Sequence, residues 1–230
     1  MLDINDYSNY IVTLEPVINS SRVIVGYDIG LKNKDDVLGC DAILDYSEKL
    51  NLIIYMLDKL TYLIEGQAKR NSFSNTIFYI TLESEYLNEP RVLIFVSVLK
   101  NLLENKKSSL VFTLQYSDFI DNSSHLYSYE YYYQQYSQID IGVICTDTVN
   151  FHQLYYQLEL QKNNNISVVK LSIDLRWFKD IITQVSPICK KKGTMIFFEN
   201  VNDDGLFFEA SNISNAMCKG RVAGGVMYLI

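Results

Sequence analysis

The chain has 230 residues and a mass of 26.6 kDa, which is long for one all-β domain and suits one α/β barrel. Its 20 Lys and Arg residues against 27 Asp and Glu residues give a net charge of −7, which disfavours direct contact with nucleic-acid phosphates. The apolar runs are much shorter than the roughly 20 residues of a membrane span and no signal peptide is visible at the first residues, so we predict one cytoplasmic domain over residues 1–230 without membrane association.

The chain begins with a predicted antiparallel hairpin. Residues 10–14 and 22–27 are rich in β-forming side chains, and the Asn-Ser-Ser sequence at 19–21 is typical of a turn. Residues 41–69 then carry apolar side chains at spacings of three and four. This periodicity predicts a helix with one buried face.

Strands and helices alternate in the rest of the chain. Alternation implies parallel strands joined by right-handed crossovers, and short continuous apolar runs suit strands buried on both faces. We therefore predict an α/β fold, a modified TIM-type (β/α)8 barrel with one antiparallel strand from the N-terminal hairpin. The predicted strands are 76–82, 110–114, 139–145, 168–171, 194–198 and 222–228; the predicted helices are 90–106, part of 121–138, 150–162, 174–191 and 203–219.

The cysteines and histidines give no metal-binding pattern. Cys145 lies in an apolar run, which indicates a buried thiol; a Cys–His nucleophile pair is the alternative. The cysteines and histidines are widely spaced in the sequence: Cys40, Cys145, Cys189, Cys218, His125 and His152.

The basic run at 190–192 follows an apolar helical pattern and suits a helix C-terminus, with a nucleic-acid patch as the alternative.

Several short segments resemble, in order, the signatures of EAL domains, the bacterial cyclic-di-GMP phosphodiesterases. The resemblance extends from about residue 7 to residue 228, and it implies the same barrel with one antiparallel strand. EPVI (15–18) and RVIVGYDIGLK (22–32) resemble Q-P-I-V and G-Y-E-A-L-L-R, VVKL (168–171) resembles I-K-I-D, IFFENV (196–201) resembles A-E-G-V-E, and GGVMY (224–228) resembles the closing Q-G-Y.

The resemblance implies a decayed metal site. EAL domains hydrolyse a phosphodiester with two divalent cations held by carboxylates at the carboxyl ends of the strands. Threonines 113 and 146 stand where the family has anionic ligands, and a neutral hydroxyl cannot offset the dehydration of a dication as a carboxylate does. We therefore expect no enzymatic activity, no bound metal and no cofactor. The vestigial pocket consists of Asp28, Lys32, Thr81, Thr113, Asp147, Lys170 and Glu199.

Nucleotide binding without catalysis is also disfavoured. In the family it depends on the arginine of E-A-L-L-R and on the closing glutamine, whose positions correspond here to Lys32 and Gly224. Lysine lacks the planar fork that binds phosphate in a bidentate way. The alternative is a cyclic-di-GMP receptor or weak phosphodiesterase that uses Asp28, Asp147, Lys170 and Glu199. An ion pair between Lys170 and Asp147 is a further hypothesis, with charge neutralisation as its purely structural explanation.

The size and the decay pattern resemble those of stand-alone EAL-like regulators. That resemblance implies a non-catalytic protein that binds FlhD of the flagellar master regulator FlhDC and so acts as a post-translational negative regulator of flagellar gene expression. A relic without function is the remaining alternative. A tyrosine-rich stretch is the candidate partner surface, because tyrosine is enriched at interfaces. Tyr129, Tyr132, Tyr133 and Tyr136 also have helical spacing, so an amphipathic helix that covers the barrel explains them equally well.

Overall fold

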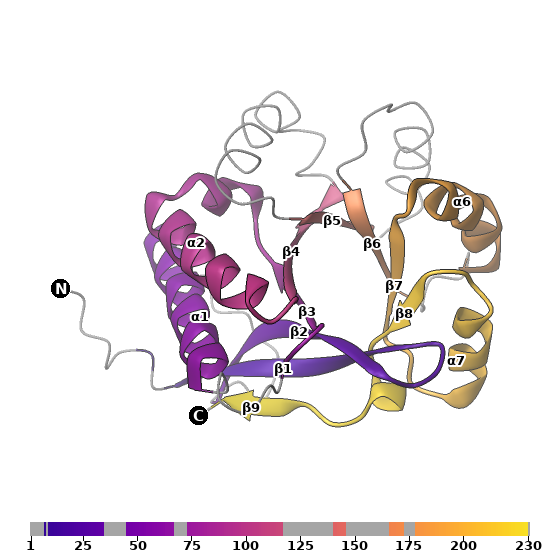
Figure 1. Cartoon of the computed structure of the whole chain (residues 1–230), viewed down its shortest axis with the longest axis horizontal. Helices are drawn as coiled ribbons and strands as arrows, with labels where there is room; N and C mark the ends of the chain where they lie inside the picture. Colours follow the sequence, from indigo (N-terminus) through magenta and orange to yellow (C-terminus); the bar gives the residue numbers. More distant parts are fainter. Residues whose placement is uncertain are drawn as a thin grey trace.

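The computed structural model describes residues 7, 9–34, 45–66, 73–116, 140–145, 166–172 and 178–229. Its strands form a closed barrel with helices packed on the outside (Figure 1). The strand order around the wall is β2-β3-β4-β5-β6-β7-β8-β1, and β1 pairs again with β2 to close the ring. This arrangement confirms the predicted α/β barrel.

The predicted hairpin forms the closure of the barrel. β1 (Tyr10–Asn19) pairs antiparallel with β2 (Ile24–Asn33), from Tyr10 opposite Asn33 to Ile18 opposite Ile24. The side chain of Asn19 accepts hydrogen bonds from the backbone N–H groups of Ser21 and Val23, at 2.9 and 3.0 Å, and so organises the turn. Because β1 is also antiparallel to β8, it is the antiparallel strand that the sequence predicts.

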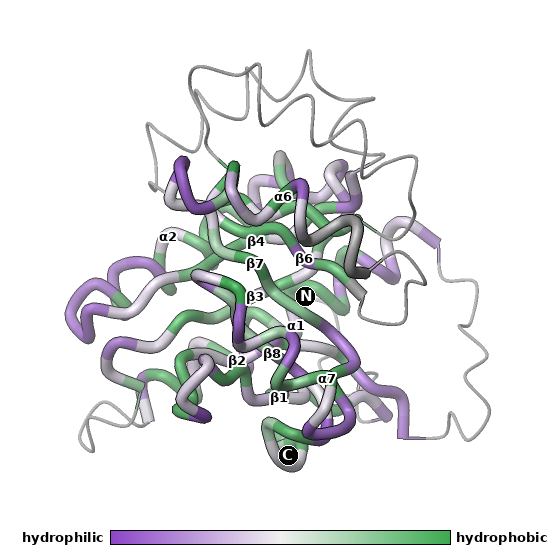
Figure 2. The backbone as a smooth tube through the Cα atoms, turned by 90° about the vertical axis from the view of Figure 1, so that its right-hand side faces the viewer, coloured by the Kyte–Doolittle hydropathy of each residue, from purple (hydrophilic) through white to green (hydrophobic). Residues whose placement is uncertain are grey.

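The other wall strands run parallel to β2. The chain is hydrophobic along these strands (Figure 2). Their side chains are buried on both faces, by the helices outside and by the barrel core inside, as expected for parallel strands. The barrel core consists of buried side chains from six strands: Val17, Tyr79, Val111, Val168, Phe197 and Met217. The wall strands other than β1 and β2 are β3 (Ile77–Thr81), β4 (Ser109–Gln115), β5 (Asp140–Cys145), β6 (Ile166–Ser172), β7 (Met195–Glu199) and β8 (Ala216–Cys218).

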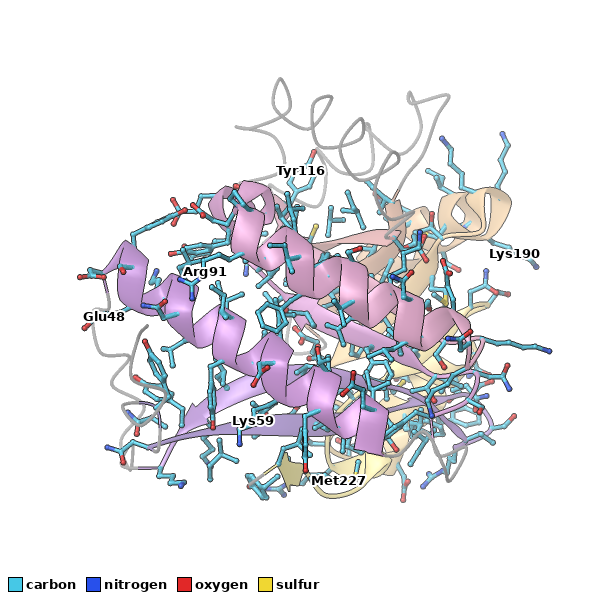
Figure 3. All side chains as sticks on the ribbon, turned by 60° about the vertical axis from the view of Figure 1, so that its left-hand side comes forward. Glu48, Lys59, Arg91, Tyr116, Lys190 and Met227 are labelled. Carbon is cyan, nitrogen blue, oxygen red and sulfur yellow. The ribbon has the colours of Figure 1, made fainter. Side chains whose placement is uncertain are left out.

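Helices cover two opposite sides of the wall. α1 (Tyr46–Gly66) and α2 (Pro90–Glu104) lie side by side on one of them (Figure 3), where Arg91 donates a hydrogen bond to Asn51 at 3.2 Å. α6 (Phe178–Lys192) and α7 (Asp204–Ser211) lie on the other. These bounds confirm the helices predicted at 41–69, 90–106 and 174–191, including the lysines in the last turn of α6. A short 3₁₀ helix, η3 (Ser84–Asn88), precedes α2, and the segments 121–138 and 150–162 lie outside the described residues.

The prediction for the last part of the chain is wrong. The helix predicted at 203–219 ends at Ser211, and the last wall strand is β8, not the segment 222–228. Closure explains the difference: without β8 the facing edges of β7 and β1 would lose backbone hydrogen-bond partners in the interior. After β8, η4 (Arg221–Ala223) leads to β9 (Met227–Leu229), which pairs antiparallel with the first half of β1.

Three cysteines lie in the described part of the chain, and all are buried free thiols. This confirms the prediction for Cys145. Burial raises the pKa of Cys189 and of Cys218 to about 12, which keeps both thiols protonated and poorly nucleophilic. None of the described helices is both long and apolar enough to cross a membrane.

Candidate functional site

Polar side chains lie directly above the apolar barrel core, toward the carboxyl ends of the parallel strands. Successive inward-facing residues of a strand are two positions apart, so the residue two positions after a core residue also faces the interior. Thr81 follows Tyr79 in this way, and Glu199 follows Phe197. The barrel therefore brings together five of the residues that the sequence indicated: Asp28, Thr81, Thr113, Lys170 and Glu199.

Lys170 lies at the centre of this group, with only 1% of its surface exposed. Its Nζ donates to Asp28 Oδ1 at 2.7 Å and to Thr81 Oγ1 at 3.5 Å. Glu199 Oε1 is 3.8 Å away, and the ring centroid of Phe197 is 4.9 Å away. A buried ammonium is costly unless a carboxylate compensates for its lost hydration. Asp28 is the residue that provides this compensation.

A second lysine, Lys219, was missed by the sequence analysis. Its Nζ is 2.5 Å from Asp28 Oδ2, 3.1 Å from Glu199 Oε1 and 3.2 Å from Glu15 Oε2. Lys219 directly follows β8, so its side chain begins at the barrel mouth. The assignment of the closing position to Gly224 is therefore wrong, because Gly224 follows η4 outside the wall. The helix predicted at 203–219 concealed the signal, which is a lysine directly after a short buried strand.

We call Glu15, Asp28, Lys170, Glu199 and Lys219 the ion-pair network. It contains three carboxylates and two ammonium groups, and both oxygens of Asp28 accept from an ammonium. Burial by itself would lower the pKa of Lys219, but Asp28 and Glu199 more than offset this and raise that pKa above its usual value. Below the network, burial first and Asp28 second raise the pKa of Tyr79, whose hydroxyl donates to Met217 Sδ at 3.1 Å.

Alkaline solution should weaken the fold through this network. A group whose pKa is higher in the folded than in the unfolded state stabilises the fold fully at pH values below its unfolded pKa, which is 10.5 for Lys219. This stabilisation is lost as the pH rises from the unfolded pKa through the folded pKa. Tyr79 acts in the same direction above its unfolded pKa of 10.0. We expect the free energy of unfolding, measured in urea, to fall above about pH 10.5 with a slope of up to about 1.4 kcal/mol per pH unit for each coupled group. The variant Lys219→Met should show a shallower fall, and an equal slope in both proteins would contradict the assignment.

Two hydroxyls, those of Thr81 and Thr113, lie at positions that the sequence resemblance matches with metal-site residues of EAL domains. Thr113 is completely buried, and its Oγ1 lies 2.9 Å from Thr81 Oγ1 and 3.4 Å from the carbonyl oxygen of Ile80. Such a neutral pair can satisfy its own hydrogen bonds but adds no negative charge. Lys32 is exposed on β2, four residues beyond Asp28. Asp147 and the candidate tyrosines 129, 132, 133 and 136 lie outside the described residues, so the Lys170–Asp147 pair stays a prediction.

A cavity of about 420 Å³ adjoins the barrel mouth, between the ends of β2 to β4, η3 and α1. Thr81 and Gln115 line it on the side of the barrel, and Tyr86 lines it on the side of η3. Lys49 and Glu83 lie at this cavity and form an ion pair of 2.9 Å. Within the part of the chain that is described, no three His, Cys, Asp or Glu side chains are grouped as metal ligands.

Comparison with solved structures identifies barrels of the same fold. The FimX EAL domain of Xanthomonas citri, in complex with c-diGMP, matches with a TM-score of 0.68 and 14% identity over 97% of this chain and 89% of that chain. The EAL enzyme Bd1971 in its cAMP-bound form matches with a TM-score of 0.72 and 12% identity over 97% of this chain and 64% of that chain. The YkuI protein of Bacillus subtilis, with an EAL domain, in complex with substrate c-di-GMP and calcium, matches with a TM-score of 0.68 and 15% identity over 98% of this chain and 59% of that chain.

Because the sequence identities are only 12–15%, these likenesses establish the fold alone. The chain spans most of the FimX domain but less than two thirds of Bd1971 and YkuI. No protein-family model matches the sequence, and a search of curated proteins finds no match.

Proposed function

We propose that this chain is a non-catalytic EAL-like barrel that acts by binding a protein, as a negative regulator of flagellar gene expression through FlhD of FlhDC. The observation that carries the proposal is the ion-pair network. Ammonium groups engage both oxygens of Asp28 and one oxygen each of Glu199 and Glu15. Asp28 and Glu199, two of the carboxylates that the EAL resemblance assigns to metals, are thus neutralised by lysines of the chain itself.

The donor set at the mouth does not fit a pair of divalent cations. Hard cations take six or more oxygen ligands, several of them anionic. Here Thr81 and Thr113 contribute neutral hydroxyls, and two ammonium groups stand among the carboxylates. A dication about 4 Å from an ammonium is repelled by roughly 8 kcal/mol at an effective dielectric constant of 20. We therefore derive no hydrolytic step for this protein.

A partner surface is available on the outside of the barrel. Arg22, in the turn of the β1–β2 hairpin, forms an ion pair with Asp204 and lies over the ring of Phe207, so the hairpin tip rests on the start of α7 (Figure 1). These two segments expose large apolar side chains: Val23 at 57%, Ile24 at 49% and Phe208 at 68%. The identity of FlhD as the partner comes from the sequence resemblance, and the tyrosines at 129, 132, 133 and 136 remain candidates for the same role.

The test combines one enzymatic and one binding measurement. We expect hydrolysis of cyclic-di-GMP in Mg²⁺ or Mn²⁺ to equal the rate without protein, and we expect purified FlhD to bind in calorimetry with a defined stoichiometry. Phe208→Ser and Tyr132→Ser examine the two candidate surfaces, and Lys190→Ser, on the exposed end of α6, is the matched control (Figure 3). Hydrolysis that depends on Asp28, or no binding of FlhD, would reject the proposal.

A cyclic-di-GMP receptor is the second candidate. It is supported by the FimX domain, which has this fold and is in complex with c-diGMP, and by the cavity of about 420 Å³ at the barrel mouth. Calorimetric titration with cyclic-di-GMP distinguishes the two functions. Saturable heat with cyclic-di-GMP at micromolar concentration, lost in Thr81→Tyr, would favour the receptor; no heat with the nucleotide favours the protein partner.

A further inference from the structure

The position of Lys219 is set by rigid backbone on both sides of it. Its N–H donates to the carbonyl oxygen of Phe198 at 2.8 Å, and its carbonyl oxygen accepts from the N–H of Val201 at 2.9 Å. Gly220 follows with a φ of 140°, and its Cα lies so close to Val201 that a side chain would not fit. The long side chain of Lys219 therefore starts from a fixed point at the mouth and reaches into the barrel.

Three carboxylates from three different strands converge on the end of that side chain. They come from β1, β2 and β7, and each has an oxygen within 3.2 Å of Nζ: Glu15, Asp28 and Glu199. Acidic residues so close together repel one another unless a cation lies between them. In this barrel the cation is a covalent part of the chain.

We infer that Lys219 is the site cation of this barrel, which takes the place of a bound divalent metal and keeps such metals out. The oxygens around Nζ lie 2.5 to 3.2 Å from it, slightly farther than the 2.3–2.6 Å of calcium ligands. Glu15 has 39% of its side chain exposed, so its carboxylate can adjust its position. Lys170 Nζ lies 2.7 Å from Asp28 Oδ1 and 3.8 Å from Glu199 Oε1, so these carboxylates can hold a hard cation such as calcium only when both ammonium groups are absent.

The test measures calcium binding in the absence of nucleotide and partner. In the double variant Lys170→Met/Lys219→Met, which keeps side chains of similar length without charge, we expect one calcium ion per chain with a Kd of about 0.1–1 mM, the range of weak calcium sites. The wild-type protein should bind calcium at least about ten-fold more weakly, as should Lys170→Met, which retains Lys219, and the control Lys190→Met. At a calcium concentration about 100-fold above its Kd, the double variant should gain about 5–10 °C in Tm.

A second variant shows where the calcium binds. Adding Glu199→Gln to the double variant should abolish the binding, because it removes one of the three carboxylates. If the double variant does not fold alone, calcium should restore its circular dichroism spectrum. The inference would be overturned by equal calcium affinity in Lys170→Met and in the double variant, or by binding that persists with Glu199→Gln. An unfolded double variant that calcium does not restore would also overturn it. The inference rests on the ion-pair geometry, so its outcome is separate from the assays of hydrolysis and FlhD binding.

Discussion

Replacing Asp28 by asparagine should lower the free energy of unfolding by about 3–5 kcal/mol, the cost of leaving a buried ion without its partner. Asp28 accepts from Lys170 on one oxygen and from Lys219 on the other. Asparagine keeps the shape but not the charge, so Lys170, 1% exposed, would keep Glu199 at 3.8 Å as its remaining carboxylate among the described residues. In thermal denaturation this corresponds to a loss of about 10 °C in Tm.

Two comparisons separate this effect from a general loss of stability. The double variant Asp28→Asn/Lys170→Met should be more stable than Asp28→Asn alone, because it removes the uncompensated ammonium as well. Glu104→Gln breaks the ion pair with Lys100, where Glu104 is 59% exposed, and should change stability by less than about 0.5 kcal/mol. If the double variant were less stable than Asp28→Asn, the network would not be the source of the stabilisation.

Gly220→Ala should destabilise the protein by about 3–5 kcal/mol, since the backbone is strained for any L side chain and no space is available. The added Cβ would lie 2.5 Å from the carbonyl oxygen of Val201 and 2.7 Å from its nitrogen. Both atoms are backbone, and that nitrogen donates to the carbonyl oxygen of Lys219, so relief of the clash breaks this hydrogen bond. Urea denaturation measures the loss directly.

Gly225 provides the matched control for this prediction. No atom lies within 4 Å of the Cβ that alanine would add there, so Gly225→Ala should stay within about 0.5 kcal/mol of the wild type. The displacement of Lys219 gives a second readout: Gly220→Ala should also show the shallower alkaline fall in stability expected for Lys219→Met. A stable Gly220→Ala protein with an unchanged alkaline profile would refute the role of this glycine in positioning Lys219.

The apolar core and the ion-pair network make different contributions to the barrel. The core, including Tyr79 and Phe197, fills the interior of the wall. The network above it stabilises the fold while its charges stay paired, and it determines which chemistry the mouth can support. A barrel whose mouth is neutralised by its own lysines keeps a rigid outer surface. This is why a protein-binding role is compatible with an EAL-like fold.

The amino-acid sequence by itself determined the elements that depend on local patterns. β-branched residues on both sides of a polar turn specified the hairpin, and apolar spacings of three and four specified α1 and α2. Alternation of strands and helices then limited the topology to a parallel barrel. The carboxylates and the lysine at the strand ends, Asp28, Lys170 and Glu199, were also visible in the sequence.

Only the tertiary structure decided the end of the wall and the centre of the site. β8 has three residues and no periodic signal of its own; it is a strand because β7 and β1 need a hydrogen-bonding neighbour on that side. Lys219 becomes the partner of Asp28, 191 positions earlier in the chain, through that same closure. Local patterns arise from contacts within a few residues, whereas ring closure and charge pairing depend on contacts between distant segments, so the sequence pattern could not reveal them.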